Sequence, residues 1–405
     1  MSLIGEAALT TAIRGVGRID HAAGGTAFGE PIWLTVLVGD PDAAQTIRGI
    51  SIDPGTDPGT DPGTAGHQPW GIYCDQGNAY PAGPAGRAPN LVIDQIAVAR
   101  FDRSIVIGTS DRPAPSGCNA AVTRSRIASK SMGVFVAGAG FGSNAENRVS
   151  ARIGGDTAAD GNQLIGNRDP DRTGSQWRHQ AAAITIYDSS SPVVIRHNTF
   201  SDNDVGIALN NFRTDAESAV DDNTFTGMTT AAVMLYANYR LQSLTGNRFT
   251  GNNAAPGNPQ PSCGDRLVLA TAICVLGYGT RPPGPQIVRA RNNVFAGNDV
   301  AVYVEGTAFA AARAFDFGTA ADPGGNRFEC NSSERAEPGH DVWFNVRGPA
   351  ATIPFAGNAW DHAPPTRGTP GAHDGTDAVV TPGGPSLDLT GATAHGRACL
   401  APHNP

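Results

Sequence analysis

The sequence predicts an all-β protein built as one parallel β-helix, with a capping segment at each end. Three observations lead to this fold class. A short phrase of polar and aromatic residues recurs along the chain, 51 Gly and 30 Pro in 405 residues provide many turns, and only 16 % of the residues are charged. Short Val/Ile stretches lie between Gly, Asn, Asp and Pro, which favours strands joined by turns over helices.

The recurring phrase is Asn-x-Phe, followed by alternating apolar residues. It is clearest in "HNTFSDNDVGIALNN" (197–211) and "NNVFAGNDVAVYVEG" (292–306). Its copies begin at Asn198, Asn223, Asn247, Asn293 and Asn326, with variants at Asn162 and Asn358. The intervals from Asn198 are 25, 24, 46, 33 and 32 residues. We interpret the interval of 46 as two units with one copy hidden by an insertion, which places the two clearest copies four turns apart.

A period of this length carries two or three short strands, which is what one coil of a parallel β-helix needs. Coils stack at the inter-strand spacing of roughly 4.8 Å, so equivalent residues form columns. Phe200 and its equivalents are expected to stack inside the coils. Asn198 and its equivalents are expected to form a hydrogen-bonded ladder at a corner, where Asn also tolerates the left-handed conformation. We therefore interpret these asparagines as architecture and not as a binding site.

Earlier strands are expected in the apolar segments 33–38, 47–52, 91–99, 104–108 and 133–138. With the repeat, these segments resemble the right-handed parallel β-helix repeat proteins of the pectate-lyase-like superfamily, over roughly residues 30–360. "FDFGTAADPGGNRF" (315–328) and "FAGNAWDH" (355–362) resemble, more narrowly, uncharacterised bacterial secreted β-helix proteins. The superfamily contains polysaccharide lyases, hydrolases and epimerases as well as non-catalytic surface proteins, so the resemblance implies a fold and no single activity.

The predicted organisation has three segments. Residues 1–30, weakly amphipathic and then Gly-rich, form an N-terminal cap, and residues 31–360 form the parallel β-helix. Residues 361–405 are rich in Pro and Gly, and we expect this C-terminal tail to pack on the helix and cover open strand edges. Because both ends are capped, we expect a monomer and not a module of a trimeric fibre.

Charge and hydropathy exclude several partners. The formal net charge is −8 and no dense basic cluster occurs, which argues against a nucleic acid as partner. No stretch approaches eighteen consecutive apolar residues, so we expect no transmembrane segment. The N-terminus lacks the charged start and apolar core of a signal peptide, which we expect to be absent from this chain.

The six cysteines predict disulfides. They are Cys74, Cys118, Cys263, Cys274, Cys330 and Cys399, and none forms a CxxC pair. An even number in polar, turn-rich contexts indicates an oxidising compartment, either extracellular or in the cell envelope. Cys263 and Cys274 flank one loop and are the first pair to expect. Fifteen connectivities are open for six cysteines, and pairing Cys74 with Cys118 and Cys330 with Cys399 is one of them.

A ligand-binding column is predicted where successive strands end. A β-helix binds chain-like ligands along exposed columns, and the residues at this position combine carboxylates, aromatics and an amide, the set that stacks on sugar rings and bonds their hydroxyls. The substrate-binding candidates are Asp188, Asn210, Tyr236, Tyr278 and Glu305. The alternative is that these are ordinary polar residues where a strand meets a loop.

Two other groups are candidates for chemistry. Tyr236, Tyr239, Arg240 and Glu305 are the catalytic candidates, since a β-eliminating lyase needs a base such as Tyr or Arg. Asp202, Asp204, Asp221 and Asp222 could bring carboxylates from two adjacent coils to a shared Ca²⁺. Against this, Asp204 and Asp299 fill the same turn position in the two clearest copies, which favours turn capping.

Two function hypotheses follow. The first is a secreted β-helix protein that binds a polysaccharide or cell-surface glycan along an exposed strand face. It either only binds this ligand or also cleaves or epimerises it, and as an enzyme it would be a polysaccharide lyase or a glycoside hydrolase. The second is a non-catalytic cell-surface or envelope protein with a structural or adhesive role. No lyase, epimerase or serine-nucleophile signature decides between them.

Overall fold

The chain of the computed structural model falls into two compact units. Residues 1–199 with 211–217 form the first unit, and residues 200–210 with 218–405 form the second. The structure describes residues 2–4, 12–14, 17–19, 32–38, 44–54, 69–74, 90–108, 117–138, 148–168, 182–187, 192–210, 217–236, 241–254, 263, 269–277, 288–306, 315–333, 337–346, 352–396 and 399. Among them, no helix is long and apolar enough to cross a membrane.

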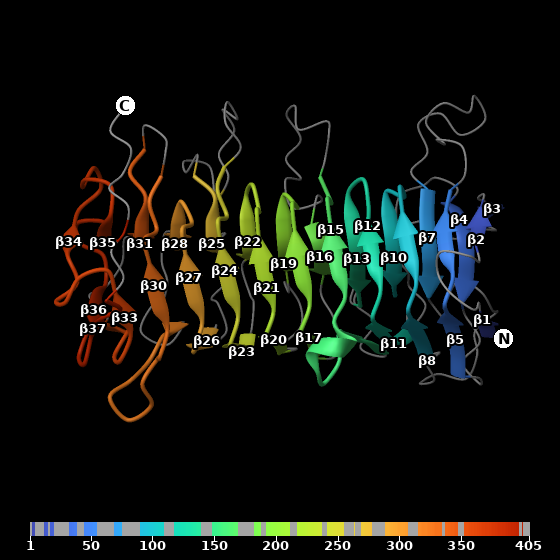
Figure 1. The fold of residues 1–405 in the computed structure, drawn as a ribbon, viewed down its shortest axis with the longest axis horizontal. Coiled ribbons are helices and arrows are strands. Elements are labelled where there is room, and N and C mark those ends of the chain that lie inside the picture. The colour runs from blue at the N-terminus through green and yellow to red at the C-terminus, as the bar shows by residue number, and fades with distance from the viewer. Residues whose placement is uncertain are drawn as a thin grey trace. The chain divides into compact units, whose positions relative to one another are not determined.

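The first unit contains three sheets whose strands follow one another in turn along the chain (Figure 1). The first sheet has the order β1 (Ser2–Ile4), β5 (Ala44–Arg48), β8 (Asn90–Asp94), β11 (Gly117–Thr123), β14 (Arg148–Ile153), β17 (Val193–Arg196). The second has the order β2 (Ala12–Arg14), β6 (Ser51–Asp53), β9 (Ala97–Ala99), β12 (Arg126–Ala128), β15 (Gln163–Ile165). The third has the order β3 (Gly17–Ile19), β4 (Ile32–Val38), β7 (Pro69–Cys74), β10 (Arg103–Ile107), β13 (Met132–Ala137), β16 (Ala182–Tyr187). A 3₁₀ turn, η1 (Ala158–Asp160), precedes β15.

The second unit repeats this arrangement. One sheet has the order β20 (Ser218–Asp221), β23 (Leu241–Thr245), β26 (Val288–Arg291), β29 (Phe315–Asp316). Another has the order β21 (Thr224–Thr226), β24 (Arg248–Thr250), β27 (Val294–Ala296), β30 (Arg327–Glu329), β33 (Ala359–Trp360), β37 (Thr393–Ala394). The third has the order β19 (Val205–Asn210), β22 (Ala231–Tyr236), β25 (Thr271–Gly277), β28 (Val300–Gly306), β31 (His340–Val346), β35 (Thr376–Val380), β34 (Arg367–Gly368). β32 (Thr352–Pro354) pairs with β36 (Ser386–Asp388), and β18 is Thr199–Ser201.

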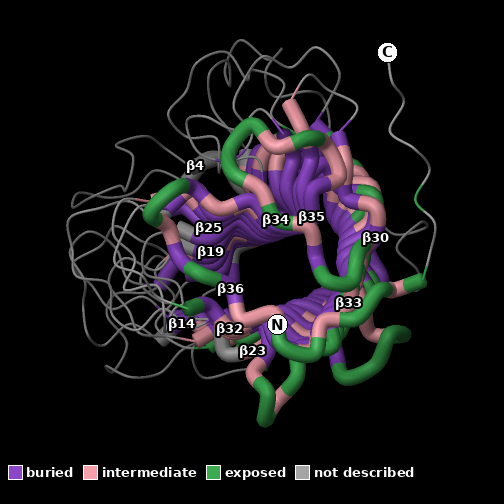
Figure 2. The backbone as a smooth tube through the Cα atoms, turned by 90° about the vertical axis from the view of Figure 1, so that its left-hand side faces the viewer, coloured by how far each residue is buried: buried purple, intermediate pink, exposed green. Residues whose placement is uncertain are grey.

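The fold class predicted from the sequence is confirmed as an all-β, right-handed parallel β-helix. β3 pairs antiparallel with β4, whereas the other described pairs are parallel. Figure 2 looks along the coils of the second unit, where strands of the different sheets surround a common interior whose residues are mostly buried. Each coil contributes short strands because the polar and glycine-rich corners between them end every strand after a few residues.

The aromatic column predicted from the Asn-x-Phe phrase is present in the second unit. The rings of Phe200, Phe225, Phe249, Phe295 and Phe328 are fully buried. Successive rings are stacked with centroids 4.5, 4.9, 4.9 and 5.0 Å apart, and Trp360 continues the column 4.5 Å from Phe328. These separations match the strand spacing of roughly 4.8 Å, so the column removes one aromatic ring per coil from water.

The asparagine ladder is also present. The Oδ1 atoms of Asn247, Asn293, Asn326 and Asn358 each accept hydrogen bonds from the backbone N–H and the side-chain amide of the asparagine one coil earlier. The ladder ends where Asn358 Nδ2 donates to the carbonyls of Phe317 and Phe355. Because every member is buried and bonded, these asparagines are architectural, as predicted.

Two details of the repeat differ from the prediction. No hidden coil occupies the interval of 46 residues, because β24 pairs directly with β27 and Asn247 bonds directly to Asn293. Phe200 and Phe295 are therefore three coils apart instead of four. The left-handed conformation falls on the residue before the ladder asparagine, such as Asp222 or Asn292, because the asparagine side chain must point along the ladder.

A second asparagine ladder, which was not predicted, runs through the same unit. Asn252 donates through its backbone N–H and side-chain amide to Asn298 Oδ1, and Asn298 donates in the same way to Asn331 Oδ1. Asn331 Nδ2 then donates to the carbonyl of Phe295 and to Asp341 Oδ1 at 2.8 Å. This ladder therefore ends on a carboxylate.

Three disulfides join cysteines within the units. Cys74 pairs with Cys118 in the first unit, and Cys263–Cys274 and Cys330–Cys399 form in the second. The predicted disulfides are confirmed, and they indicate an oxidising compartment.

Strands occur on both sides of the predicted segment boundaries. In residues 1–30, β1 and β2 pair in parallel with β5 and β6. In residues 361–405, β35, β36 and β37 pair in parallel with β31, β32 and β33. The boundaries at 30 and 360 stay predictions, and coil strands lie on either side of each.

Candidate functional site

The column predicted to bind a ligand is defined by the register of five strands. Asn210 lies opposite Tyr236, Tyr236 opposite Leu276, Leu276 opposite Glu305, and Glu305 opposite Asn345. Leu276 therefore takes the position that we predicted for Tyr278. The error arose because the strand in β25 begins at Thr271, aligned with Ala231, so the "VLGY" phrase reaches the column two residues before its tyrosine.

Several predicted residues lie beyond what the structure describes. Asp188, Tyr239, Arg240 and Tyr278 fall outside the described residues. Asn210 and Tyr236 are described as strand residues by their backbone pairing alone. The catalytic cluster of Tyr236, Tyr239 and Arg240 therefore stays a prediction, and Glu305 is the member of the predicted column whose side-chain contacts are described.

Glu305 belongs to a polar and aromatic patch, which we call the Trp343 patch and define as Tyr303, Glu305, Trp343 and Asn345. Tyr303 and Trp343 lie opposite each other on β28 and β31, with perpendicular rings 5.6 Å apart. The Tyr303 hydroxyl donates to Glu305 Oε2 at 3.1 Å and accepts from Asn345 Nδ2 at 3.2 Å. Tyr303 is buried, whereas the other three are half-buried, so the patch presents a ring, a carboxylate and an amide in a fixed arrangement.

A second aromatic cluster lies in the first unit. Trp70 is half-buried and meets the buried ring of Tyr73 at 85°, with centroids 5.3 Å apart. The Arg103 guanidinium lies 5.0 Å from the Trp70 ring and 5.1 Å from the Phe135 ring. The rings of this cluster thus already contact a cation of the chain itself, the Arg103 guanidinium.

The four aspartates proposed for Ca²⁺ are placed separately. Asp204 is buried and accepts from the Thr229 hydroxyl at 2.7 Å, and Asp221 accepts from the Thr245 N–H at 3.2 Å. Asp202 and Asp222 are exposed residues in the left-handed conformation at corners. In the described part of the chain they do not join a group of three ligands, and Asp299 accepts from the backbone N–H groups of Ala254 and Ala270.

A different group of carboxylates does come together, and we call it the carboxylate triad: Asp341, Asp361 and Asp377. Each offers an oxygen within 4.8 Å of the oxygens of the other two. Asp341 and Asp377 are each 1 % exposed, and the Asp361 side chain is 10 % exposed. Three carboxylates at this separation, shielded from water, repel one another strongly unless a proton or a cation lies among them.

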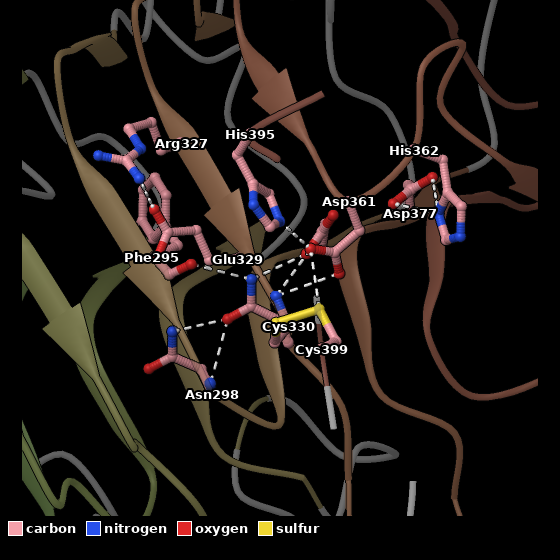
Figure 3. Close-up of a disulfide and its surroundings, with 12 residues drawn as sticks. Phe295, Asn298, Arg327, Glu329, Cys330, Asp361, His362, Asp377, His395 and Cys399 are labelled. Carbon is pink, nitrogen blue, oxygen red and sulfur yellow. Dashed lines mark hydrogen bonds and ion pairs between the residues drawn. A yellow bond between two sulfur atoms is a disulfide. The ribbon is translucent and has the colours of Figure 1, made fainter. Parts of the chain in front are cut away.

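Two members of the triad are held firmly from outside. Asp377 Oδ2 accepts from the Thr366 hydroxyl at 2.8 Å and from His362 Nδ1 at 2.9 Å. Asp361 accepts from the Cys330 N–H, at 2.9 Å to Oδ1 and 3.1 Å to Oδ2, and from the ring of His395. Figure 3 shows Asp361 between His395 and the Cys330–Cys399 disulfide, with His362 facing Asp377.

The third member, Asp341, is less well satisfied. Asn331 bonds to Oδ1, but Oδ2 is buried and receives no hydrogen bond. Burial, and then the negative charge of Asp361, raise the pKa of the Asp341 carboxyl well above its ordinary value, and Asp377 adds to this while the Asn331 bond opposes it. A proton on Asp341 would let it donate to the neighbouring carboxylate of Asp377.

Cys330, Asp361, His395 and Cys399 also lie close together. The two sulfurs are joined in a disulfide, so they do not offer thiolates to a metal. The carboxylate triad is therefore the group in the described residues that could hold a metal ion as the chain stands.

The sequence contained a signal for the triad that the prediction missed. Asp341 and Asp377 are each the second residue of their strand, in "HDVWFNV" (β31) and "TDAVV" (β35). Comparing this strand position between coils would have found them. Asp361 could not be joined to them by spacing, because it comes from the segment after β33 and not from that position.

Comparisons with known proteins agree with this architecture without assigning a function. A family model described as a protein of unknown function, DUF1565, matches residues 127–367, more than half of the chain. The chain belongs to the DUF1565 family. The match covers β13 to β33 and includes the Trp343 patch and two of the three triad carboxylates, Asp341 and Asp361. No curated protein and no solved structure matches the chain.

Proposed function

We propose that this DUF1565 protein is a secreted glycan-binding β-helix protein whose recognition surface includes the Trp343 patch. The observation that carries the proposal is the pairing of a half-buried Trp343 with Tyr303, whose hydroxyl links Glu305 and Asn345. Aromatic rings stack on the apolar faces of sugars, and carboxylates and amides bond their hydroxyls. A patch fixed by strands in this way needs little reordering when a ligand binds.

The geometry favours binding over bond cleavage. Hydrolysis of a glycosidic bond uses two carboxyls roughly 5 to 10 Å apart. The register neighbours of Glu305 are Leu276 and Asn345, so the adjacent strands supply no second carboxylate at that position. The three disulfides support an oxidising location, where surface glycans and polysaccharides occur.

Binding to a panel of uronate-containing and neutral polysaccharides tests the proposal. We expect Trp343→Ala to weaken binding of any ligand found by about tenfold, because loss of ring stacking costs about 1.4 kcal/mol. Trp70→Ala is the matched control, since Trp70 is also half-buried and meets a tyrosine at a right angle, and it should bind as the unchanged protein does. Isothermal titration calorimetry measures both affinities.

The same panel separates the hypotheses. Reducing ends or unsaturated products would show turnover and would contradict a purely binding role. Absence of binding to every member of a broad panel would leave the structural or adhesive role as the better hypothesis.

A further inference from the structure

The carboxylate triad interrupts a column of small residues in the second unit. Val205, Ala231, Thr271, Val300, His340 and Thr376 lie opposite one another in register, as do Ile207, Val233, Ile273, Val302, Val342 and Ala378. The position between these two rows holds Gly206, Ala232, Ala272 and Ala301 in four successive strands, and then Asp341 and Asp377. Side chains without polar atoms give way to two opposed, buried carboxylates in the last two strands.

A third carboxylate is brought to the same place by different means. Asp361 follows Trp360, whose ring stacks on Phe328, and its oxygens accept from the Cys330 N–H. The segment after it returns to Asp377, where the Thr366 hydroxyl donates. Asp361 is therefore fixed next to Asp341 and Asp377 by the aromatic column and by the hydrogen bond from Cys330.

Among the described residues, only two histidines are basic partners of this charge. No lysine or arginine in the described residues forms an ion pair with Asp341, Asp361 or Asp377, and His362 and His395 are the basic residues bonded to the triad. The buried Asp341 Oδ2 receives no donor at all. A buried carboxylate oxygen without a donor is costly, and a cation removes that cost.

We propose that the carboxylate triad binds a divalent cation with a preference for oxygen ligands, namely Ca²⁺. Ca²⁺ lies about 2.3–2.6 Å from its ligands, so two oxygens on one ion are at most about 5.2 Å apart. The three carboxylate oxygens of the triad meet that limit. Six to eight ligands are usual, so water or carbonyl oxygens complete the shell.

A cation at this place would join three parts of the chain. Asp341 is on β31, Asp377 on β35, and Asp361 leads into the segment that covers them. The bound ion would hold residues 361–366 against β31 and β35. This role is independent of glycan binding, and either proposal stands if the other fails.

Terbium luminescence tests the site directly, since Tb³⁺ replaces Ca²⁺ at oxygen-rich sites and is excited by nearby tryptophans, here Trp343 and Trp360. The full chain, freed of metal with a chelator and dialysed, is titrated with Tb³⁺ at neutral pH under tryptophan excitation. We expect saturable emission from one site, displaced by Ca²⁺. Asp341→Asn should weaken Tb³⁺ binding at least tenfold, and Asp377→Asn provides a second variant.

The matched control is Asp94→Asn, which changes a buried carboxylate that pairs with arginines, and it should leave the emission unchanged. Equilibrium dialysis with Ca²⁺ gives the stoichiometry, expected as one ion per chain and none for Asp341→Asn. If the unchanged chain binds no Ca²⁺ at millimolar concentration, protons and not a cation balance the triad, and the proposal is wrong. Equal Tb³⁺ affinity in the unchanged chain and in folded Asp341→Asn and Asp377→Asn variants would also overturn it.

Discussion

Asp94 in the first unit and Asp341 in the second are both buried carboxylates, but their surroundings are opposite. Asp94 is 4 % exposed and accepts from Arg124 through both oxygens, from the Thr123 hydroxyl and from Arg48. Burial alone would raise the pKa of Asp94, but the bonds from Arg124 and Thr123 and the charges of both arginines outweigh it and hold that pKa below its ordinary value.

Asp341 is 1 % exposed and has one donor, Asn331, while Asp361 and Asp377 face it. Its pKa is raised, first by burial and then by the charge of Asp361. The difference shows that burial by itself does not decide the direction in which the pKa of a carboxyl group shifts. Arginines of the chain balance the negative charge of Asp94, whereas the charge of Asp341 has to be balanced by a proton or a cation.

The largest effect is expected from removing the single donor of Asp341. Asn331→Ala takes away the bond to Asp341 Oδ1, both bonds that Asn298 donates to Asn331 and the bond to the Phe295 carbonyl, and only the Asn298 side-chain amide keeps a second partner, the Phe249 carbonyl. Each unsatisfied buried group costs about 1–3 kcal/mol, so we expect a loss of about 3 kcal/mol or more. Urea unfolding followed by circular dichroism measures it.

Asn90→Ala is the control for that substitution. Asn90 is exposed and its amide oxygen accepts a long 3.4 Å bond from Asn119, so the free energy of unfolding should change by less than about 0.5 kcal/mol. Similar losses in the two variants would mean that the second ladder contributes no more than a surface contact.

The same substitution should have opposite signs at the two aspartates. In the presence of a chelator, Asp94→Asn removes the anion that Arg48 and Arg124 share and should lower the free energy of unfolding by about 1–2 kcal/mol, a range reduced because both arginines are partly exposed. Asp341→Asn relieves a like-charge contact and should raise it by about 1 kcal/mol. Chemical unfolding of both variants gives the signs, and a loss at both positions would contradict the comparison.

A smaller effect is expected from pH. Because the folded state lowers the pKa of Asp94 below 3.8, the unfolded state binds more protons in the interval between the two values, and stability falls as the pH falls. The stability that Asp94 contributes is fully present above 3.8 and is lost as the pH falls through the folded value. The difference in unfolding free energy between the unchanged chain and Asp94→Asn should therefore be constant near neutral pH and should shrink as the pH falls into the acid range. A difference that grows in acid would contradict the assigned ion pairs.

Much of the fold could be predicted because the repeat puts equivalent residues in columns. The Asn-x-Phe phrase placed Asn293 in a ladder and Phe295 in a stack, both confirmed. The hidden coil was a wrong prediction, because spacing alone cannot distinguish two coils from one coil with a long insertion. Tyr278 was assigned to the wrong register position because the insertion before β25 obscured where that strand begins.

The candidate sites were harder to predict. Glu305 was identified from its strand end, but Trp343 and Asn345 emerged only when β31 was paired with β28. Asp341, Asp361 and Asp377 are separated in sequence, and only pairing and the turn after Trp360 bring them together. Comparing strand positions could have paired Asp341 with Asp377, but Asp361 comes from a different part of the coil and no spacing in the sequence links it to them.

The central claim is that the carboxylate triad binds a cation, whereas Asp94 is balanced by arginines of the chain. The most direct test is to measure the free energy of unfolding of the full chain in Ca²⁺ and in a chelator. At a Ca²⁺ concentration one hundred times the dissociation constant, the unchanged chain should gain about 2.7 kcal/mol. Asp94→Asn should show the same gain and Asp341→Asn none. Equal stability of the unchanged chain in Ca²⁺ and in chelator would contradict the claim.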